Sequence, residues 1–199
     1  DEYVANWKST WTRGQICKGR VRIKDGIEQT IGDIEYYSAS KMYDWLMRDQ
    51  PKVVWSHWAW NRVNVPKHSF IAWLMMHKRL LTKERMKRKG YNSDEQCDIC
   101  GELTEMQQHL FFDCPFARQC WRLMATWLGI KGRDNMVEWV IKWRCKSLLK
   151  KQVVMASIAA VVYGIWETRN KCRHDFCVRS PNDLIKHVKA TTKIRINFF

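Results

Sequence analysis

Four residues between positions 97 and 114 are of types that bind metal ions, and they are closely spaced. The segment reads CDICGELTEMQQHLFFDC and places Cys97, Cys100, His109 and Cys114 in the pattern C-x2-C-x8-H-x4-C. Two cysteines separated by two residues can present both sulfurs to one point, and Gly101 supplies the permissive backbone that such a turn usually needs. Three thiolates and one imidazole suit Zn²⁺, whereas Mg²⁺ and Ca²⁺ prefer oxygen ligands. The pattern therefore predicts one zinc ion.

Four protein ligands predict a structural zinc site, because a catalytic zinc keeps a water molecule in its fourth position. Two alternatives are ordinary reduced thiols with His109 as a polar residue on a helix, and a redox-active Cys-x-x-Cys motif. The redox motif fits poorly, since thioredoxin-like motifs follow a strand in a βαβ unit and no such alternation surrounds Cys97. Near the C-terminus, Cys172, His174 and Cys177 are too few to predict a second zinc site.

The charge of the chain predicts a polyanionic partner. The 35 Lys and Arg residues against 20 Asp and Glu residues give a formal net charge of +15. Such a balance is typical of nucleic-acid binders, and it also fits a basic subunit docked on an acidic protein. The positive charge is densest between positions 78 and 89, the basic segment, where Glu84 is the one acid among Lys78, Arg79, Lys83, Arg85, Lys87, Arg88 and Lys89. We expect phosphate contacts there, with a merely solvated helix face as the alternative.

The hydrophobic pattern predicts a mostly α-helical fold with a small β-ribbon near the N-terminus and one knuckle-like zinc site. Residues 20–38 alternate around Asp25-Gly26, which indicates a two-stranded ribbon. Helical spacing of apolar residues, with Ser, Thr, Pro and Gly at the ends, predicts the helices. They span residues 39–48, a short stretch within 53–65, 66–77, 83–89, 115–128, 136–143, 152–170 and a last basic helix after Pro181.

The aromatic and cysteine content indicates how the protein could contact a partner and in which cell compartment it would occur. Twelve tryptophans can fill a core or stack on bases, and for Trp55, Trp58 and Trp60 we expect core packing. Eight cysteines without a signal peptide favour thiols and metal over disulfides, and hence the nucleus or cytoplasm. No uninterrupted apolar run approaches the length of a membrane span.

The order of these pieces resembles the zinc-binding domain that follows the reverse transcriptase in plant LINE-type, non-LTR retrotransposons. The resemblance rests on YYSASKMYDWL, on VVWSHWAWNRVNVPKHSFIAWLMMHKRLLTKERMKRKGY and on CDICGELTEMQQHLFFDCPFARQCW. It implies an N-terminal arm at 1–19, the zinc-binding domain at 20–130 and a helical C-terminal extension at 131–199 packed on it. It also implies that Cys97, Cys100, His109 and Cys114 are the zinc ligands. The later IWETRN is similar to the family's linker toward RNase H.

The function that we expect is binding of nucleic acid, RNA or single-stranded DNA with RNA favoured, by a zinc-stabilised domain derived from a retrotransposon polyprotein. We expect no enzyme activity, because no polymerase signature, spaced carboxylate pair, Ser-His-Asp set or open metal site is present. A reverse transcriptase or a host protein would be a further partner, and a membrane would not. The alternative is a domesticated protein-interaction module that uses an aromatic surface.

Overall fold

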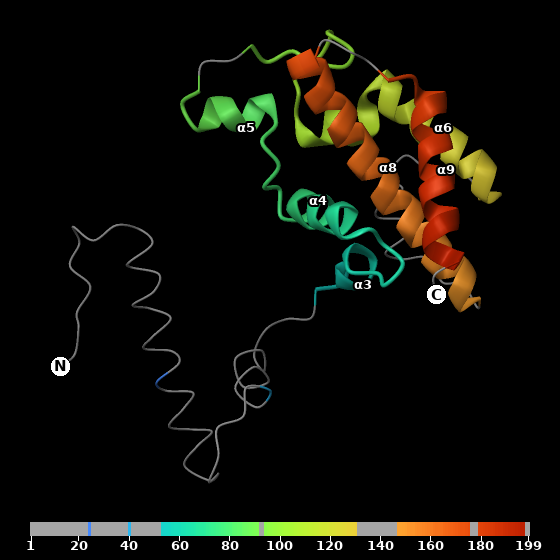
Figure 1. The fold of residues 1–199 in the computed structure, drawn as a ribbon. Helices are drawn as coiled ribbons and strands as arrows, with labels where there is room; N and C mark the ends of the chain where they lie inside the picture. Colours follow the sequence, from blue (N-terminus) through green and yellow to red (C-terminus); the bar gives the residue numbers. More distant parts are fainter. Residues whose placement is uncertain are drawn as a thin grey trace. The chain divides into compact units, whose positions relative to one another are not determined.

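The computed structural model describes residues 53–91, 94–130, 147–175 and 179–197, together with Lys24 and Ser40. The chain divides into two units, residues 1–52 and 53–199, and the fold below is that of the second unit (Figure 1). The predicted N-terminal arm and the predicted helix at 136–143 lie outside the described residues, as does the helix at 39–48 except for Ser40, which is helical. The predicted β-ribbon is not supported: it lies outside the described residues except for Lys24, and Lys24 is helical.

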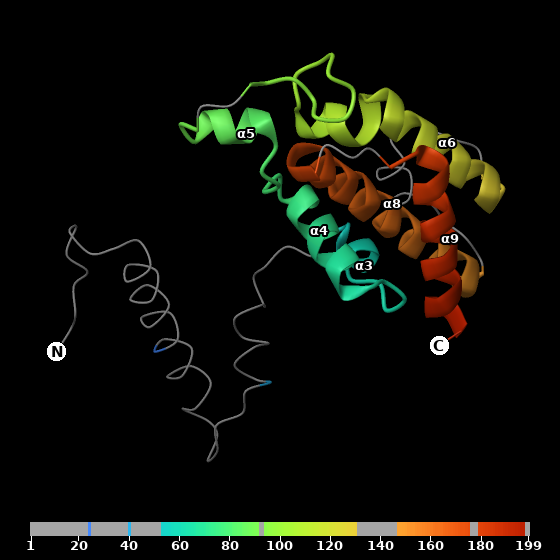
Figure 2. The same ribbon diagram turned by 45° about the horizontal axis from the view of Figure 1, so that its top comes forward.

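A long central helix organises the described part of the chain. Helix α8 (Leu148–Asp175) packs against α3 (Ser56–Ala59), α4 (Pro66–Met76), α6 (Pro115–Leu128), α9 (Pro181–Asn197) and the short π-helix η1 (His109–Asp113). Figures 1 and 2 show α8 lying between α4 on one side and α9 on the other, with α6 across them. Helix α5 (Lys83–Arg88) lies at the edge of this bundle. The fold is mostly helical, as predicted, and the β-structure in the described ranges is one isolated bridge between Gln96 and Thr104.

Helix α8 is buried on several sides because its apolar residues are not confined to one stripe. A helix that is apolar nearly all round must be covered by neighbours. Small residues let those neighbours approach closely: a Cβ atom added at Gly164 would lie 2.9 Å from the side chain of Leu184 on α9. The apolar core residues that α8 contributes include Val154, Met155, Ile158, Ala159, Val161, Val162 and Ile165.

The same composition would allow α8 to cross a membrane by length and hydropathy alone. An 18-residue window within Leu148–His174 has a mean hydropathy of 1.5, and 61% of that window is buried inside the fold. Core helices of globular domains pass the same test, because burial in a protein and burial in lipid select the same residues. We therefore describe α8 as the core helix of this unit.

The predicted helix boundaries are confirmed where caps define them. Helix α4 begins at Pro66, and α6 begins at Pro115 and ends before Gly129, whose φ is +61°. Thr82 caps α5 by accepting a hydrogen bond from the backbone N–H of Arg85 at 3.4 Å. Helix α8 begins earlier than the predicted residue 152, because Ser147 Oγ accepts a hydrogen bond from the N–H of Lys150 and caps it there.

The tryptophans before α4 are used in different ways. Trp58 is fully buried, and its indole Nε1 donates a hydrogen bond to the carbonyl of Met155 on α8 at 3.2 Å. Trp55 packs edge-on against His77 with ring centroids 5.2 Å apart. Trp60, in contrast, is 56% exposed. The expected core role is thus confirmed for Trp58, and not for Trp60.

Candidate metal centre

The first two candidate ligands lie on a tight turn that backbone hydrogen bonds hold closed. The bridge between Gln96 and Thr104 brings its two ends together, and the N–H of Cys97 donates to the carbonyl of Leu103 at 2.8 Å. The N–H of Gly101 then donates back to the carbonyl of Cys97, also at 2.8 Å. Gly101 has a φ of +72°, a conformation that side chains with a Cβ disfavour. The predicted role of this glycine is confirmed.

The other two candidate ligands are His109, the first residue of the π-helix η1, and Cys114, the residue that follows it. In an α-helix, residues five positions apart point about 140° away from each other. In a π-helix the i to i+5 hydrogen bond brings such residues to the same side. Here the N–H of Cys114 donates to the carbonyl of His109 at 2.7 Å. The indole Nε1 of Trp121 on α6 donates to the carbonyl of Phe111 at 2.6 Å, and this hydrogen bond anchors η1 to α6.

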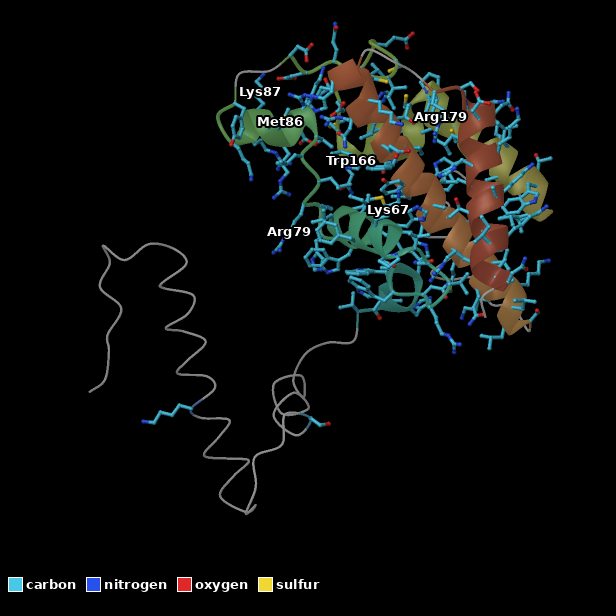
Figure 3. All side chains as sticks on the ribbon, viewed as in Figure 1. Lys67, Arg79, Met86, Lys87, Trp166 and Arg179 are labelled. Carbon is cyan, nitrogen blue, oxygen red and sulfur yellow. The ribbon has the colours of Figure 1, made fainter. Side chains whose placement is uncertain are left out.

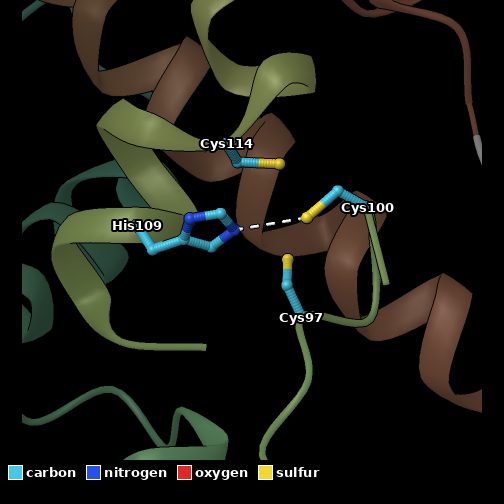
Figure 4. Close-up of side chains that lie close together, drawn as sticks. All are labelled: Cys97, Cys100, His109 and Cys114. Atoms are coloured by element: carbon cyan, nitrogen blue, oxygen red, sulfur yellow. Dashed lines mark hydrogen bonds between the residues drawn. The ribbon is translucent and has the colours of Figure 1, made fainter. Parts of the chain in front are cut away.

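The four side chains converge on one point. The candidate ligand atoms of Cys97, Cys100, His109 and Cys114 all lie within 4.8 Å of one another (Figure 4). The Sγ of Cys100 is 3.3 Å from Nε2 of His109. Tetrahedral zinc with Zn–S bonds of about 2.3 Å requires ligand atoms about 3.8 Å apart, which this cluster can satisfy with small movements. The cluster therefore fits one zinc ion, and its soft donor set does not suit Mg²⁺ or Ca²⁺.

The burial of the cluster is that of a closed site. Cys97, Cys114 and His109 are 1%, 0% and 4% exposed, and Cys100 is partly exposed. The Nδ1 atom of His109 is buried without a hydrogen-bond partner among the described residues. A zinc ion held by all four of these residues would have no open coordination position for a substrate.

The electrostatics of the ligands fit metal binding as well. A hydrogen bond with Cys114 and burial raise the pKa of Cys97, and the same hydrogen bond lowers the pKa of Cys114. Of these two thiols, Cys114 is thus the one that loses its proton first. Burial lowers the pKa of His109, which keeps its ring neutral and able to donate a lone pair. Burial raises the pKa of Cys120 to about 12, and this fully buried thiol lies in the apolar core, as predicted.

A buried carboxylate that sequence reasoning missed docks the metal-binding loop onto α8. Glu105 is fully buried, and Arg169 of α8 donates to it from Nη2 at 2.6 Å and from Nε at 3.1 Å. The backbone N–H groups of Lys83 and Asp98 also donate to Glu105, at 3.0 and 3.4 Å. Glu105 therefore joins α5, the cysteine turn and α8. No local pattern marks it, because its partner lies 64 positions away.

The IWETRN segment, whose sequence is similar to the family's linker toward RNase H, lies inside α8 as residues 165–170. Ile165, Thr168 and Arg169 are all at most 3% exposed. The segment belongs to the core that supports the metal-binding loop.

The basic segment is divided by the fold into two groups. Lys83 is 5% exposed, and its Nζ pairs with Asp94 and Asp98 at 2.5 Å each. Burial opposes its charge, but the hydrogen bonds to the two aspartates outweigh this and raise its pKa. Arg85 is half-buried and donates to the carbonyl of Lys78. The remaining five cations, the outer cations, are exposed: Lys78, Arg79, Lys87, Arg88 and Lys89.

The comparison with protein families agrees with this geometry. Residues 37–121 match the family described as zinc-binding in reverse transcriptase. The segment is thus similar to zinc-binding domains of this reverse-transcriptase-associated kind. The match covers less than half of the 199 residues and includes all four candidate ligands. No curated protein and no solved structure shows a significant match to the chain.

Proposed function

We propose that this zinc-binding domain binds single-stranded nucleic acid, with RNA favoured, through the outer cations of its basic segment. The observation that carries the proposal is the exposure of Lys78, Arg79, Lys87, Arg88 and Lys89 beside the metal centre. Exposed lysine and arginine neutralise phosphates and release counterions on binding. The excess of 15 positive charges over the whole chain adds long-range attraction for a polyanion.

The surface ion pairs of the basic segment do not compete strongly with phosphate. Lys87 pairs with Glu95, and Arg88 lies 3.4 Å from Glu84, four positions earlier on the helix. The side chains of Lys87 and Arg88 remain 63% and 69% exposed. Exposed ion pairs of this kind stabilise a fold by about 0 to 1 kcal/mol. A phosphate group that binds Lys87 or Arg88 can therefore replace the acidic partner. Lys83 and Arg85 are left out of the proposed surface, because Lys83 is buried in ion pairs with Asp94 and Asp98 and Arg85 donates to a backbone carbonyl.

The proposal places the domain beside a reverse transcriptase in an element of the plant LINE type, holding template or target strand. The family match supports the association with a reverse transcriptase, and the sequence motifs support the plant LINE type. We also propose that the domain is a binding module and not an enzyme, and the closed four-ligand metal site supports that reading.

A salt titration tests the proposal. Replacing Arg79, Arg88 and Lys89 with glutamine should weaken binding of a labelled single-stranded RNA. The slope of log affinity against log salt concentration should fall by about 2 to 3, since each lost phosphate contact removes roughly 0.7 to 0.9. Zinc content and unfolding temperature should stay unchanged, because these side chains lie in water.

The matched control removes the same charge elsewhere. Arg122 on α6 and Lys186 and Lys193 on α9 are exposed and lie outside the basic segment. Their triple glutamine variant should keep nearly the parent's salt slope. If the two triple variants give the same slope, the outer cations are only a solvated face. Binding of a protein partner through an aromatic surface, with little salt dependence, would then be the better explanation.

A further inference from the structure

An aromatic pocket lies on α8 beside the basic segment. It has a volume of about 330 Å³ and is lined by Ile71 of α4 and by Tyr163, Trp166, Glu167, Asn170, Lys171 and His174 of α8. The α8 residues recur every three or four positions, so they share one face of the helix. The volume is within the range of pockets that hold small ligands. The metal centre uses none of these residues.

Trp166 is the residue in the pocket best placed for stacking. Its indole is partly buried, and the guanidinium of Arg169 lies over the ring at 5.0 Å from the centroid. Arg169 in turn donates hydrogen bonds to Glu105, which fixes its guanidinium over the Trp166 ring. The ring of Tyr163 is already engaged by His68, with centroids 4.6 Å apart, and by Lys67. Tyr163 is therefore held in place at the pocket, and Trp166 is the other aromatic residue that lines it.

The charges around the pocket favour an anionic ligand with a flat ring. Lys171 and His174 are exposed at its rim. Glu167 is the one acid among the lining residues. Nη1 of Arg179 lies 3.5 Å from Oε2 of Glu167 and offsets its negative charge. The oxygen of the Asn170 amide accepts a hydrogen bond from Arg169 at 3.0 Å, which orients this polar group. An apolar, aromatic floor with a cationic rim is the chemistry that recognises a base and its phosphate.

The part of α8 that carries the pocket lies next to α5 of the basic segment. Arg173, between the two rim residues, has its Nη1 3.5 Å from Sδ of Met86 on α5. Figure 3 shows Arg79, Met86 and Lys87 on and before α5, with Trp166 on the adjoining part of α8. A strand whose phosphates lie on α5 can therefore turn one base toward α8.

We propose that this pocket takes one unpaired base of a single-stranded nucleic acid, stacked between Trp166 and Ile71, while Lys171 and His174 contact the flanking phosphate. The inference rests on the proposed function, because it assumes that the basic segment holds the strand. It adds a requirement for an unpaired base, which a phosphate-binding surface alone does not have. Duplexes, whose bases are stacked internally, are excluded from the pocket.

The test compares two strands of equal length and charge, one with bases and one abasic, by fluorescence anisotropy with the full chain. The strand with bases should bind about 5- to 150-fold more tightly, the range expected for one stacked base. Trp166→Leu, which keeps apolar volume and removes the indole, should lose most of this preference. The control Trp127→Leu removes another half-buried indole under a cation, Lys189, outside the pocket, and should keep the preference.

The outcomes separate the two proposals. If neither strand binds, the proposed function fails and the pocket has no strand to serve. If both strands bind the parent equally, the proposed function stands and the base pocket is wrong; an aromatic side chain of a protein partner would then be the better occupant. The comparison of the two strands on the parent decides this even if Trp166→Leu does not fold.

Discussion

Burial separates residues that look equivalent in the sequence. Lys83 and Lys87 are one helical turn apart in the same basic segment, yet Lys83 is 5% exposed between two aspartates, whereas the side chain of Lys87 is 63% exposed. The first lysine stabilises the loop that carries the cysteines, and the second can reach a ligand. His68 is a similar case among the histidines, because it lies in the core while His57 is exposed.

We predict that His68 makes the fold less stable in mild acid. It is 3% exposed, stacks on Tyr163 of α8 and lies near Lys67, His187 and Arg195. Burial, and then these positive groups, lower its pKa from 6.5 to about 4. Between these values the unfolded chain binds a proton that the folded chain does not. Stability should therefore fall as the pH drops below about 6.5, by about 2 kcal/mol at pH 5 from this group.

Denaturant unfolding at pH 7 and pH 5 in excess zinc measures this effect. In His68→Gln the loss of unfolding free energy between the two pH values should be smaller than in the parent by about 2 kcal/mol. His57→Gln, at an exposed position on α3, should behave like the parent. Acid release of zinc affects all three proteins alike, so it cancels in the comparison. Equal pH dependence of His68→Gln and the parent would show that His68 is not held neutral.

At the scale of elements, α8 supports the metal centre as well as the core. It contacts η1 directly, and through Arg169 it holds Glu105 in the loop between the cysteine turn and η1. The π-helix in turn is tied to α6 by Trp121. The metal-binding loop is therefore positioned by helices from both sides of it in the chain, and not by its own backbone alone.

We predict that Glu105 and Arg169 are strongly coupled. Glu105→Ala should lower the free energy of unfolding by about 3 to 5 kcal/mol, because it removes the main partner of a buried guanidinium. Arg169→Ala should cost a similar amount, and the double variant should cost clearly less than the sum. Denaturant unfolding of the four proteins gives the coupling. Simple additivity would mean that the pair is not a unit.

An exposed ion pair serves as the reference for this comparison of single and double variants. Lys186 and Asp183 on α9 lie 3.6 Å apart with both side chains mostly exposed. Lys186→Ala should leave the free energy of unfolding nearly unchanged, since solvent screens such pairs. The contrast between the two pairs isolates the effect of burial from that of charge.

At the scale of the whole second unit, the fold has two sources of stability. Helices α3, α4, α6, α8 and α9 share a continuous apolar core. The cysteine turn has few backbone hydrogen bonds of its own and exposes Leu103 and Met106. A zinc ion bound there would add to the order of this turn, because binding free energy at a structural zinc site is folding free energy for the local segment.

We predict one tightly held zinc ion per chain, whose removal unfolds the protein only in part. Chelation, or Cys97→Ser, should abolish hydrogen-exchange protection in residues 95–114 and weaken it in α5. Protection in α4, α8 and α9 should persist, because these helices pack mainly on one another and only in part on the segment that carries the metal ligands. Elemental analysis of the parent should give about one zinc equivalent.

The control for this prediction is another buried cysteine. Cys120 is fully buried in the core and lies outside the metal cluster, so Cys120→Ala should retain zinc. A metal-free chain with the parent's exchange pattern would contradict a structural role for the metal. Loss of protection across all helices at once would contradict the division into two sources of stability.

The sequence by itself determined the features that depend on local chemistry. Thr82, Pro115, Gly101 and Gly129 set caps and turns through their own backbone preferences, and each is found in the predicted role. The four metal ligands were predicted from residue type and spacing, and the family match spans all of them.

Only the tertiary structure decided what depends on partners far away in the chain. The π-turn of η1 is fixed by Trp121, and the charge of Glu105 is matched by an arginine 64 positions later. Lys83 of the basic segment is buried and therefore not available to a ligand, and the IWETRN segment lies in the core helix α8. Local patterns cannot specify these outcomes, because burial and ion pairing depend on which segments meet after folding, and the spacing of residues along the chain does not contain that information.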